Sequence, residues 1–236
     1  MTKILSQLEQ LKEIALDLLF PSRCVSCGSE GEFICASCRR LLPRILPPLC
    51  PRCGKPLPEA QLCSGCRGWQ AQIEGIRSPF RFEGVARQAI HELKYQNLKV
   101  LAPHLAELLQ GYLSIYPLPG EVLVPVPLHP RRLRGRGYNQ SGLLARELGR
   151  LVSLPVVEGS IHRMRNTPPQ ARSTSMVIRQ SNVAGAFACR DQHMKQRQVL
   201  LIDDVCTTGA TLNACAVALR AAGAASVWGL TLAREI

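Results

Sequence analysis

The sequence predicts an α/β fold, a parallel sheet flanked by helices, that follows a small cysteine-rich module. Two observations support this prediction. From residue 75 onward, short apolar or β-branched runs alternate with segments whose apolar residues recur every three or four positions, an order typical of a parallel sheet with right-handed crossovers. Between Phe20 and Gly68 the chain is rich in cysteine and proline and short of large apolar residues, so it can hardly build a core without metal ions.

Chain length and composition agree with this arrangement. The 236 residues suffice for one medium-sized α/β domain plus a small module, and a hydrophobic content of 46% is ordinary for a packed core. We therefore expect an amphipathic helix over residues 1–20, a metal-binding module over 21–70 and the α/β domain over 71–236.

The first 20 residues carry an apolar stripe at helical spacing: Ile4, Leu8, Leu11, Ala15 and Leu18. Charged residues interrupt this stretch, so it lacks the apolar core of a secretory signal, and no segment approaches transmembrane length. We therefore expect a cytoplasmic protein whose first helix packs on the protein or on a partner. Docking at the inner face of the cytoplasmic membrane is a less favoured alternative, because the polar face carries charges of both signs.

Eight of the 11 cysteines form four Cys-x-x-Cys pairs. Two intervening residues let both sulfurs of a pair face one ion from a tight turn, and four sulfurs complete the shell of a structural Zn²⁺. Gly28 and Gly54 directly follow the second cysteine of a pair, where such a turn tends to need a positive φ. Sequential pairing gives two zinc sites, with ligands Cys24, Cys27, Cys35 and Cys38 for one and Cys50, Cys53, Cys63 and Cys66 for the other; interleaved pairing is the alternative.

Two other uses of these cysteines are disfavoured. A disulfide framework would require export, which no signal supports, and a redox motif would be expected once beside a βαβ unit. The remaining thiols, Cys189, Cys206 and Cys215, stand apart and are expected to be small core residues.

Within the α/β domain the apolar pattern predicts each element in turn. The expected elements are helices at 86–93 and 101–113, a strand at 121–126, a helix at 139–152, a strand near Val156 and Val157, a strand at 198–202, a helix at 210–222 that Gly223 ends, and a strand at 226–232.

The charge distribution points to a phosphate-bearing ligand. The chain carries a formal net charge of +12, and between Val122 and Arg190 there are eleven arginines, no lysine and only two acids, Glu147 and Glu158. Arginine grips phosphate through two parallel hydrogen bonds, which lysine cannot do. We therefore expect a polyanionic partner, among which phosphates, nucleic acid and an anionic membrane remain open.

The segment from 199 to 211 combines features of a ligand site. Asp203 and Asp204 follow an apolar run and are expected directly off the carboxyl end of that strand, where parallel sheets bind ligands. The residues after them lead onto a helix N-terminus, whose free N–H groups favour phosphate. Threonine hydroxyls add donors, and a glycine allows close approach; these residues are Thr207, Thr208, Gly209, Ala210 and Thr211. The paired carboxylates would bond ribose hydroxyls or a Mg²⁺ ion.

This segment resembles the fingerprint of type I phosphoribosyltransferases, which has two acids, an apolar pair and Thr-Thr-Gly-x-Thr. The resemblance implies that fold, with Asp203 and Asp204 on the ribose hydroxyls of phosphoribosyl pyrophosphate and residues 207–211 on its 5-phosphate. Residues 124–140, 91–95 and the leading cysteine pairs resemble the ComF family, which has an N-terminal double zinc ribbon. That resemblance implies a pyrophosphate- or phosphate-binding group made of Arg131, Arg132, Arg134, Arg136, Arg163, Arg165, Gln170 and Arg172.

The ComF resemblance implies a role in natural competence or in DNA utilisation. Expected partners are phosphoribosyl pyrophosphate with Mg²⁺, single-stranded DNA, and a helicase or membrane channel of the uptake machinery. One alternative is an active phosphoribosyltransferase that transfers the pentosyl group to an unidentified acceptor; another is a regulator that senses the ligand. A glutaminase domain and an N-terminal nucleophilic cysteine are both missing from the sequence, so ammonia from glutamine is excluded as its acceptor.

Overall fold

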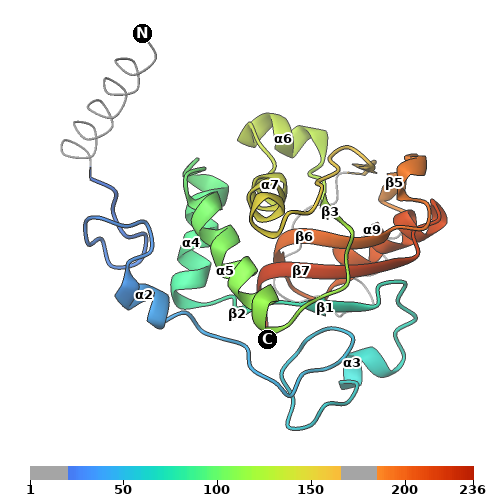
Figure 1. The fold of residues 1–236 in the computed structure, drawn as a ribbon, viewed down its shortest axis with the longest axis horizontal. Helices are drawn as coiled ribbons and strands as arrows, with labels where there is room; N and C mark the ends of the chain where they lie inside the picture. The colour runs from blue at the N-terminus through green and yellow to red at the C-terminus, as the bar shows by residue number, and fades with distance from the viewer. Residues whose placement is uncertain (1–20, 166–184) are drawn as a thin grey trace.

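The computed structural model describes residues 21–165 and 185–236 and contains the expected parallel sheet. Its strands follow the order β1-β7-β6-β3, all parallel, and β2 pairs with β7 beyond β1 (Figure 1). The bounds are β1 Gly75–Arg77, β2 Phe80–Arg81, β3 Val122–Pro125, β6 Gln198–Cys206 and β7 Ser226–Arg234. Central β6 and β7 are the longest strands, and both end at the same edge of the sheet.

Helices cover both faces of the sheet. Helices α4 (Gly84–Tyr95), α5 (Leu101–Ile115) and α7 (Gln140–Val152) pack on the face that carries Leu200 and Ile202, whereas α9 (Ala210–Ala221) packs on the face of Val199 and Leu201. Successive β6 residues therefore enter opposite cores, which explains why the strand is a continuous apolar run.

The predicted helices and the strands at β3, β6 and β7 are confirmed, with several differences. Strand β6 continues through Asp203 and Asp204 to Cys206, because β7 also continues and supplies ladder partners; our expectation that the acids follow the strand was wrong. Near Val156 there is only an isolated bridge to Leu123 rather than a strand. Unpredicted elements are β1, β2, α6 (Pro130–Arg136), a 3-10 turn η1 (Gln192–Met194) and an antiparallel pair, β4 (Ile161–Arg163) with β5 (Phe187–Cys189).

The cysteine-rich part forms two zinc knuckles, one around Cys24, Cys27, Cys35 and Cys38 and the other around Cys50, Cys53, Cys63 and Cys66. The two knuckles pack against different parts of the α/β domain. The first contains α2 (Ala36–Arg40), and its Ile34 and Leu42 join the core beneath α4 and α5. The second contains α3 (Ser64–Arg67), and its Trp69 joins the core beneath α9. Figure 1 shows α2 beside α4 and α3 beneath the sheet edge at β1. The docking of both knuckles explains how a segment with few large apolar residues is still well packed.

The expected N-terminal amphipathic helix lies outside the described residues. Among the helices that are described, none has the length and apolar character needed to cross a membrane.

Candidate functional site

The eight paired cysteines gather in two groups of four, in sequential order. Cys24, Cys27, Cys35 and Cys38 form one group and Cys50, Cys53, Cys63 and Cys66 the other, with the sulfurs of each group within 4.8 Å of one another. Cys27 Sγ lies 3.6 Å from Cys35 Sγ, and Cys53 Sγ lies 3.7 Å from Cys63 Sγ. Four sulfurs around Zn²⁺ would lie about 3.8 Å apart. The residues thus fit two structural zinc ions, and interleaved pairing is excluded.

The local backbone conformation favours metal binding in both knuckles. Gly28 and Gly54 have φ values of +76° and +72°, as the turns were predicted to need. Burial alone would raise the pKa of Cys24 and Cys50, but neighbouring backbone N–H groups outweigh it and lower each pKa to about 6. The zinc-binding thiolate is therefore readily formed at these positions.

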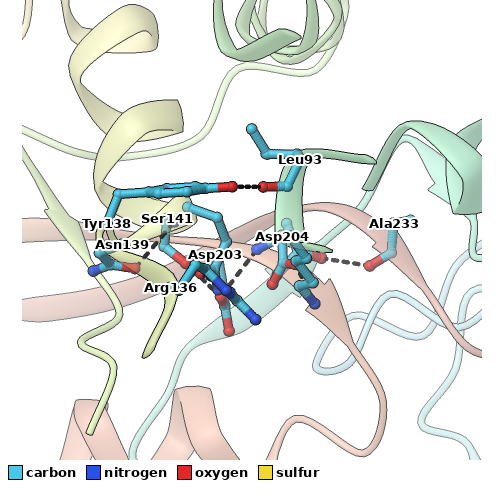
Figure 2. Close-up of polar contacts among 11 residues, drawn as sticks. Leu93, Arg136, Tyr138, Asn139, Ser141, Asp203, Asp204 and Ala233 are labelled. Atoms are coloured by element: carbon cyan, nitrogen blue, oxygen red, sulfur yellow. Dashed lines mark hydrogen bonds and ion pairs between the residues drawn. The ribbon is translucent and has the colours of Figure 1, made fainter. Parts of the chain in front are cut away.

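Asp203 and Asp204, the acid pair, lie near the carboxyl end of β6, and their carboxylates have different partners. Asp203 Oδ1 accepts a hydrogen bond from Ser141 Oγ at 2.7 Å and from the Asp204 N–H at 3.0 Å (Figure 2). Burial raises the pKa of Asp203, whereas Ser141, Lys94 and Arg163 oppose that rise. The Ser141 hydroxyl belongs to the first turn of α7, which places the start of that helix against the strand end.

Asp204 is more deeply buried, 3% exposed, and forms an ion pair with Lys94 of α4. This is a charge contact rather than an aligned hydrogen bond, since Asp204 Oδ2 accepts none from the described residues. The pKa of Lys94 is lowered to about 8, chiefly by burial; Asp203 opposes this shift, and Arg136 and Arg132 add to it. Lys94 is thus a partly buried cation that stands between the acid pair and the arginines of α6.

Residues 207–211 lead from the strand onto α9 as predicted. Gly209 is the N-cap of α9 with φ +82°, a conformation that L side chains rarely adopt. Thr207, Thr208 and Thr211 are only partly buried, whereas Gly209 and Ala210 are buried, so the loop packs on the core at its glycine and reaches the surface at its threonines. The Thr208 hydroxyl accepts a hydrogen bond from the Ala210 N–H at 3.3 Å. The turn therefore places threonine hydroxyls and helix N-terminal amides side by side.

The arginines of α6 do not all face the acid pair. Arg132 and Arg136, one helical turn apart, line a groove of about 620 Å³, whereas Arg131 and Arg134 are exposed on the same helix. The groove lies between α6 and the end of α4; its lining residues are Lys94, Tyr95, Asn97, Arg132, Gly135, Arg136 and Tyr138. The Tyr138 hydroxyl donates to the Leu93 carbonyl, which ties the end of α6 to the helix turn that carries Lys94 (Figure 2).

Arg163 joins this group from β4. Its guanidinium lies 5.4 Å from the Phe187 ring centre, and burial followed by the charge of Arg132 lowers its pKa, while Asp203 opposes the shift. Arg165 is exposed at the end of the described segment. Gln170 and Arg172 lie outside the described residues. The structure thus brings Arg132 and Arg136 near Lys94, and Arg163 near Arg132 and Asp203.

Comparison with known proteins agrees with these features. Residues 15–67 match a double zinc ribbon domain family. Competence protein F of Haemophilus influenzae is 32% identical over 91% of this chain and 98% of its own length. The chain belongs to the ComF family. Other relatives are competence protein ComFC of Bacillus subtilis, 29% identical over 86% of this chain and 85% of its own, and DNA utilization protein YhgH of Escherichia coli K12, 31% identical over 86% and 91%.

Among solved structures, this ComF-family chain is similar to a glutamine phosphoribosylpyrophosphate amidotransferase from B. subtilis, with a TM-score of 0.38, 18% identity and 56% of this chain covered. The similar region spans 26% of that enzyme's length.

Sequence reasoning missed the partners of the acid pair in this ComF-family chain. The sequence marks Lys94 only as part of the family-like segment 91–95, and no local pattern marks Ser141. A lysine in the last turn of α4 is ordinary in itself, and only the packing of α4 on the sheet brings it to Asp204.

Proposed function

We propose that this ComF-family protein binds phosphoribosyl pyrophosphate at residues 203–211 and acts in DNA uptake or DNA utilisation. One observation carries the proposal: a carboxylate pair near a strand end, with Asp204 buried, lies between a glycine-capped helix N-terminus and a groove lined by cations. The ligand has the same three parts in the same order, namely a ribose with its hydroxyls, a 5-phosphate and a pyrophosphate.

Each part of the ligand has a chemically matched partner. Asp203 and Asp204 accept hydrogen bonds from the ribose hydroxyls, and the amides and hydroxyls of residues 207–211 receive the 5-phosphate. Lys94, Arg132 and Arg136 receive the pyrophosphate. Because Asp204 is 3% exposed and is paired with Lys94, the ribose reaches it as Lys94 turns toward the pyrophosphate.

Mg²⁺ would enter the site with the ligand rather than bind to the free protein. Carboxylate and phosphate oxygens suit Mg²⁺, but Asp203 and Asp204 already have Ser141 and Lys94 as partners. The ion therefore arrives with the pyrophosphate, and these residues hold the sugar that it accompanies.

The same groove supports a second ligand, single-stranded DNA. Its cations lie beside Tyr95, whose side chain is largely exposed, 65%, and whose ring lies 5.4 Å from the Arg136 guanidinium. Cations that follow a phosphodiester backbone next to an accessible aromatic face are typical of single-strand binding. The names of the relatives, competence and DNA utilization proteins, agree with this role.

Calorimetric titration separates the ribose contacts from the general attraction of cations for phosphate. The double substitution Asp203→Asn and Asp204→Asn should abolish binding of phosphoribosyl pyrophosphate but leave binding of inorganic pyrophosphate unchanged or tighter, because two negative charges are removed. Glu83→Gln, an exposed acid with no side-chain cap bond at the far end of α4, is the control. Unchanged affinity for phosphoribosyl pyrophosphate in the double variant contradicts the proposal.

Pyrophosphate release tests whether the bound ligand is also turned over. Phosphoribosyl pyrophosphate is incubated with the protein and candidate acceptors, and released pyrophosphate is measured. Release that depends on an acceptor assigns pentosyl transfer to the site, and binding without release assigns a binding or sensing role.

A further inference from the structure

The chain that leaves the second zinc knuckle (Cys50, Cys53, Cys63 and Cys66) runs directly beneath the loop 207–211. The Trp69 N–H donates to the carbonyl of Cys66 at 3.3 Å, which fixes the tryptophan to the last zinc ligand. A Cβ built on Gly209 would lie 3.3 Å from Trp69 Cη2 and 2.6 Å from Ile76 Cδ1. The backbone of the loop therefore rests on Trp69 and Ile76 with no space between them.

A second contact holds the first turn of α9 to the same segment. Asn213 Oδ1 accepts hydrogen bonds from the backbone N–H groups of Gln72, at 2.8 Å, and Ile73, at 3.3 Å. The Asn213 N–H in turn donates to the Gly209 carbonyl at 2.9 Å. The N-terminus of α9 is thus fastened to residues that follow Cys66 within a few positions.

Arg234 makes a third connection, from the other side of the knuckle. Its side chain is 4% exposed and donates to the Cys53 carbonyl, while its Nε makes no hydrogen bond to any described residue. It lies at the end of β7, in register with Cys206, and the Glu235 N–H donates to the Cys206 carbonyl at 2.9 Å. A zinc ion with four thiolates carries net negative charge, so a buried guanidinium next to Cys53 balances it.

The first knuckle makes contacts of another kind. Arg39 of α2 lies 3.6 Å from Glu107 of α5, and the Phe33 ring lies 5.6 Å from His104 of the same helix. These contacts join it to the opposite face of the sheet from α9. The chain therefore contains its own control, a second zinc site that is bound in the same way but docked elsewhere.

We propose that Trp69 and Arg234 are positioning residues, through which the second zinc knuckle holds the loop 207–211 in the shape that receives a phosphate group. Loss of that zinc ion then loosens the loop and weakens ligand binding, whereas loss of the ion in the first knuckle does not. The identity of the ligand rests on the proposed function, but the effect of zinc on the loop does not.

Hydrogen exchange measured by mass spectrometry on the full chain tests the effect without any ligand. Cys66→Ser should remove one zinc ion and speed amide exchange in residues 207–213, while exchange in α7 stays unchanged. Cys38→Ser should also remove one zinc ion but leave exchange in 207–213 as in the wild type. Equal exchange of residues 207–213 in the two variants overturns the proposal.

Substitutions that keep the zinc ligands intact cover the case in which Cys66→Ser does not fold. Arg234→Met should retain two zinc ions yet speed exchange in 207–213 and weaken binding of phosphoribosyl pyrophosphate about tenfold, a typical coupling between sites. Arg234→Lys, which keeps the charge, should restore most of the affinity. Wild-type exchange in Arg234→Met overturns the role of Arg234.

Ligand binding and hydrogen exchange test the proposed function and the present inference independently. If the wild-type protein does not bind phosphoribosyl pyrophosphate, the proposed function is wrong, and the exchange comparison still decides whether the second zinc knuckle holds the loop. If binding is present but insensitive to zinc loss in the second knuckle, only the present inference is wrong.

Discussion

Alanine at position 209 tests whether the loop 207–211 is packed as tightly as the structure indicates. The added methyl group meets a positive φ of +82° and the Cδ1 atom of Ile76 at 2.6 Å. The backbone conformation costs an alanine about 1–2 kcal/mol, and an extra carbon in a filled core costs about 1–3 kcal/mol. Gly209→Ala should therefore reduce the free energy of unfolding by about 2–5 kcal/mol.

Position 137 provides the matched control. Gly137 has φ +80°, and a Cβ there meets nothing within 4 Å. Gly137→Ala should lose only the backbone part, about 1–2 kcal/mol. The difference between the two variants then measures the packing of the loop on its support.

A double-mutant cycle, with stability measured by urea unfolding, tests whether Ile76 Cδ1 causes the loss of stability in Gly209→Ala. Ile76→Val removes the Cδ1 atom that the new methyl group would meet, and alone it should cost about 0.5–1.5 kcal/mol. Combined with Gly209→Ala it should restore stability, with a coupling energy of at least about 1 kcal/mol. Equal losses at positions 209 and 137, together with additive effects of the pair, would refute the packing argument.

The remaining predictions concern metal, pH and nucleic acid. Metal analysis of the purified protein should find two zinc ions per chain, matching the two groups of four cysteines, and their removal should unfold the knuckles; a metal-free chain with folded knuckles contradicts the assignment. The pKa of Lys94 falls from 10.5 to about 8, so the unfolded chain holds more protons between these values and the free energy of unfolding should rise with pH across that window. Lys94→Met should remove this rise, and a pH profile that matches the wild type counts against the buried lysine. Binding of single-stranded DNA should weaken with salt, and Arg132→Gln with Arg136→Gln should reduce the slope of log K against log salt by about 1.4, at about 0.7 per phosphate. Arg131→Gln with Arg134→Gln, exposed on the same helix, should change the slope less; a salt-independent affinity rules out this interface.

The amphipathic segments and the apolar runs were predictable because burial on one face or on both leaves a direct trace in the sequence. Helices α5, α7 and α9 and strands β6 and β7 follow from that pattern. Helix α6 left no such trace, because none of its residues is buried, and only Pro130 at its start and His129 at its cap mark it. Strands β1 and β2 are too short to show a pattern, and pairing with β7 creates them.

The candidate site, too, was predictable from the sequence only in part. The cysteine spacing and the segment 203–211 could be recognised because their chemistry is local in sequence. The partners could not, because Lys94 and Ser141 reach the acid pair from helices whose position is set by packing on the sheet. The prediction of a strand near Val156 was wrong for a related reason. The preceding residue is Pro155, and the segment forms a single bridge to Leu123 instead of a ladder.

A crystal structure of the protein with phosphoribosyl pyrophosphate and Mg²⁺ tests the central claim most directly. The ribose hydroxyls should lie within hydrogen-bonding distance of Asp203 and Asp204, and the 5-phosphate should contact the amides of residues 207–211. Density for the ligand at another surface, or its absence at saturating concentration, would contradict the assignment of this strand end as the binding site.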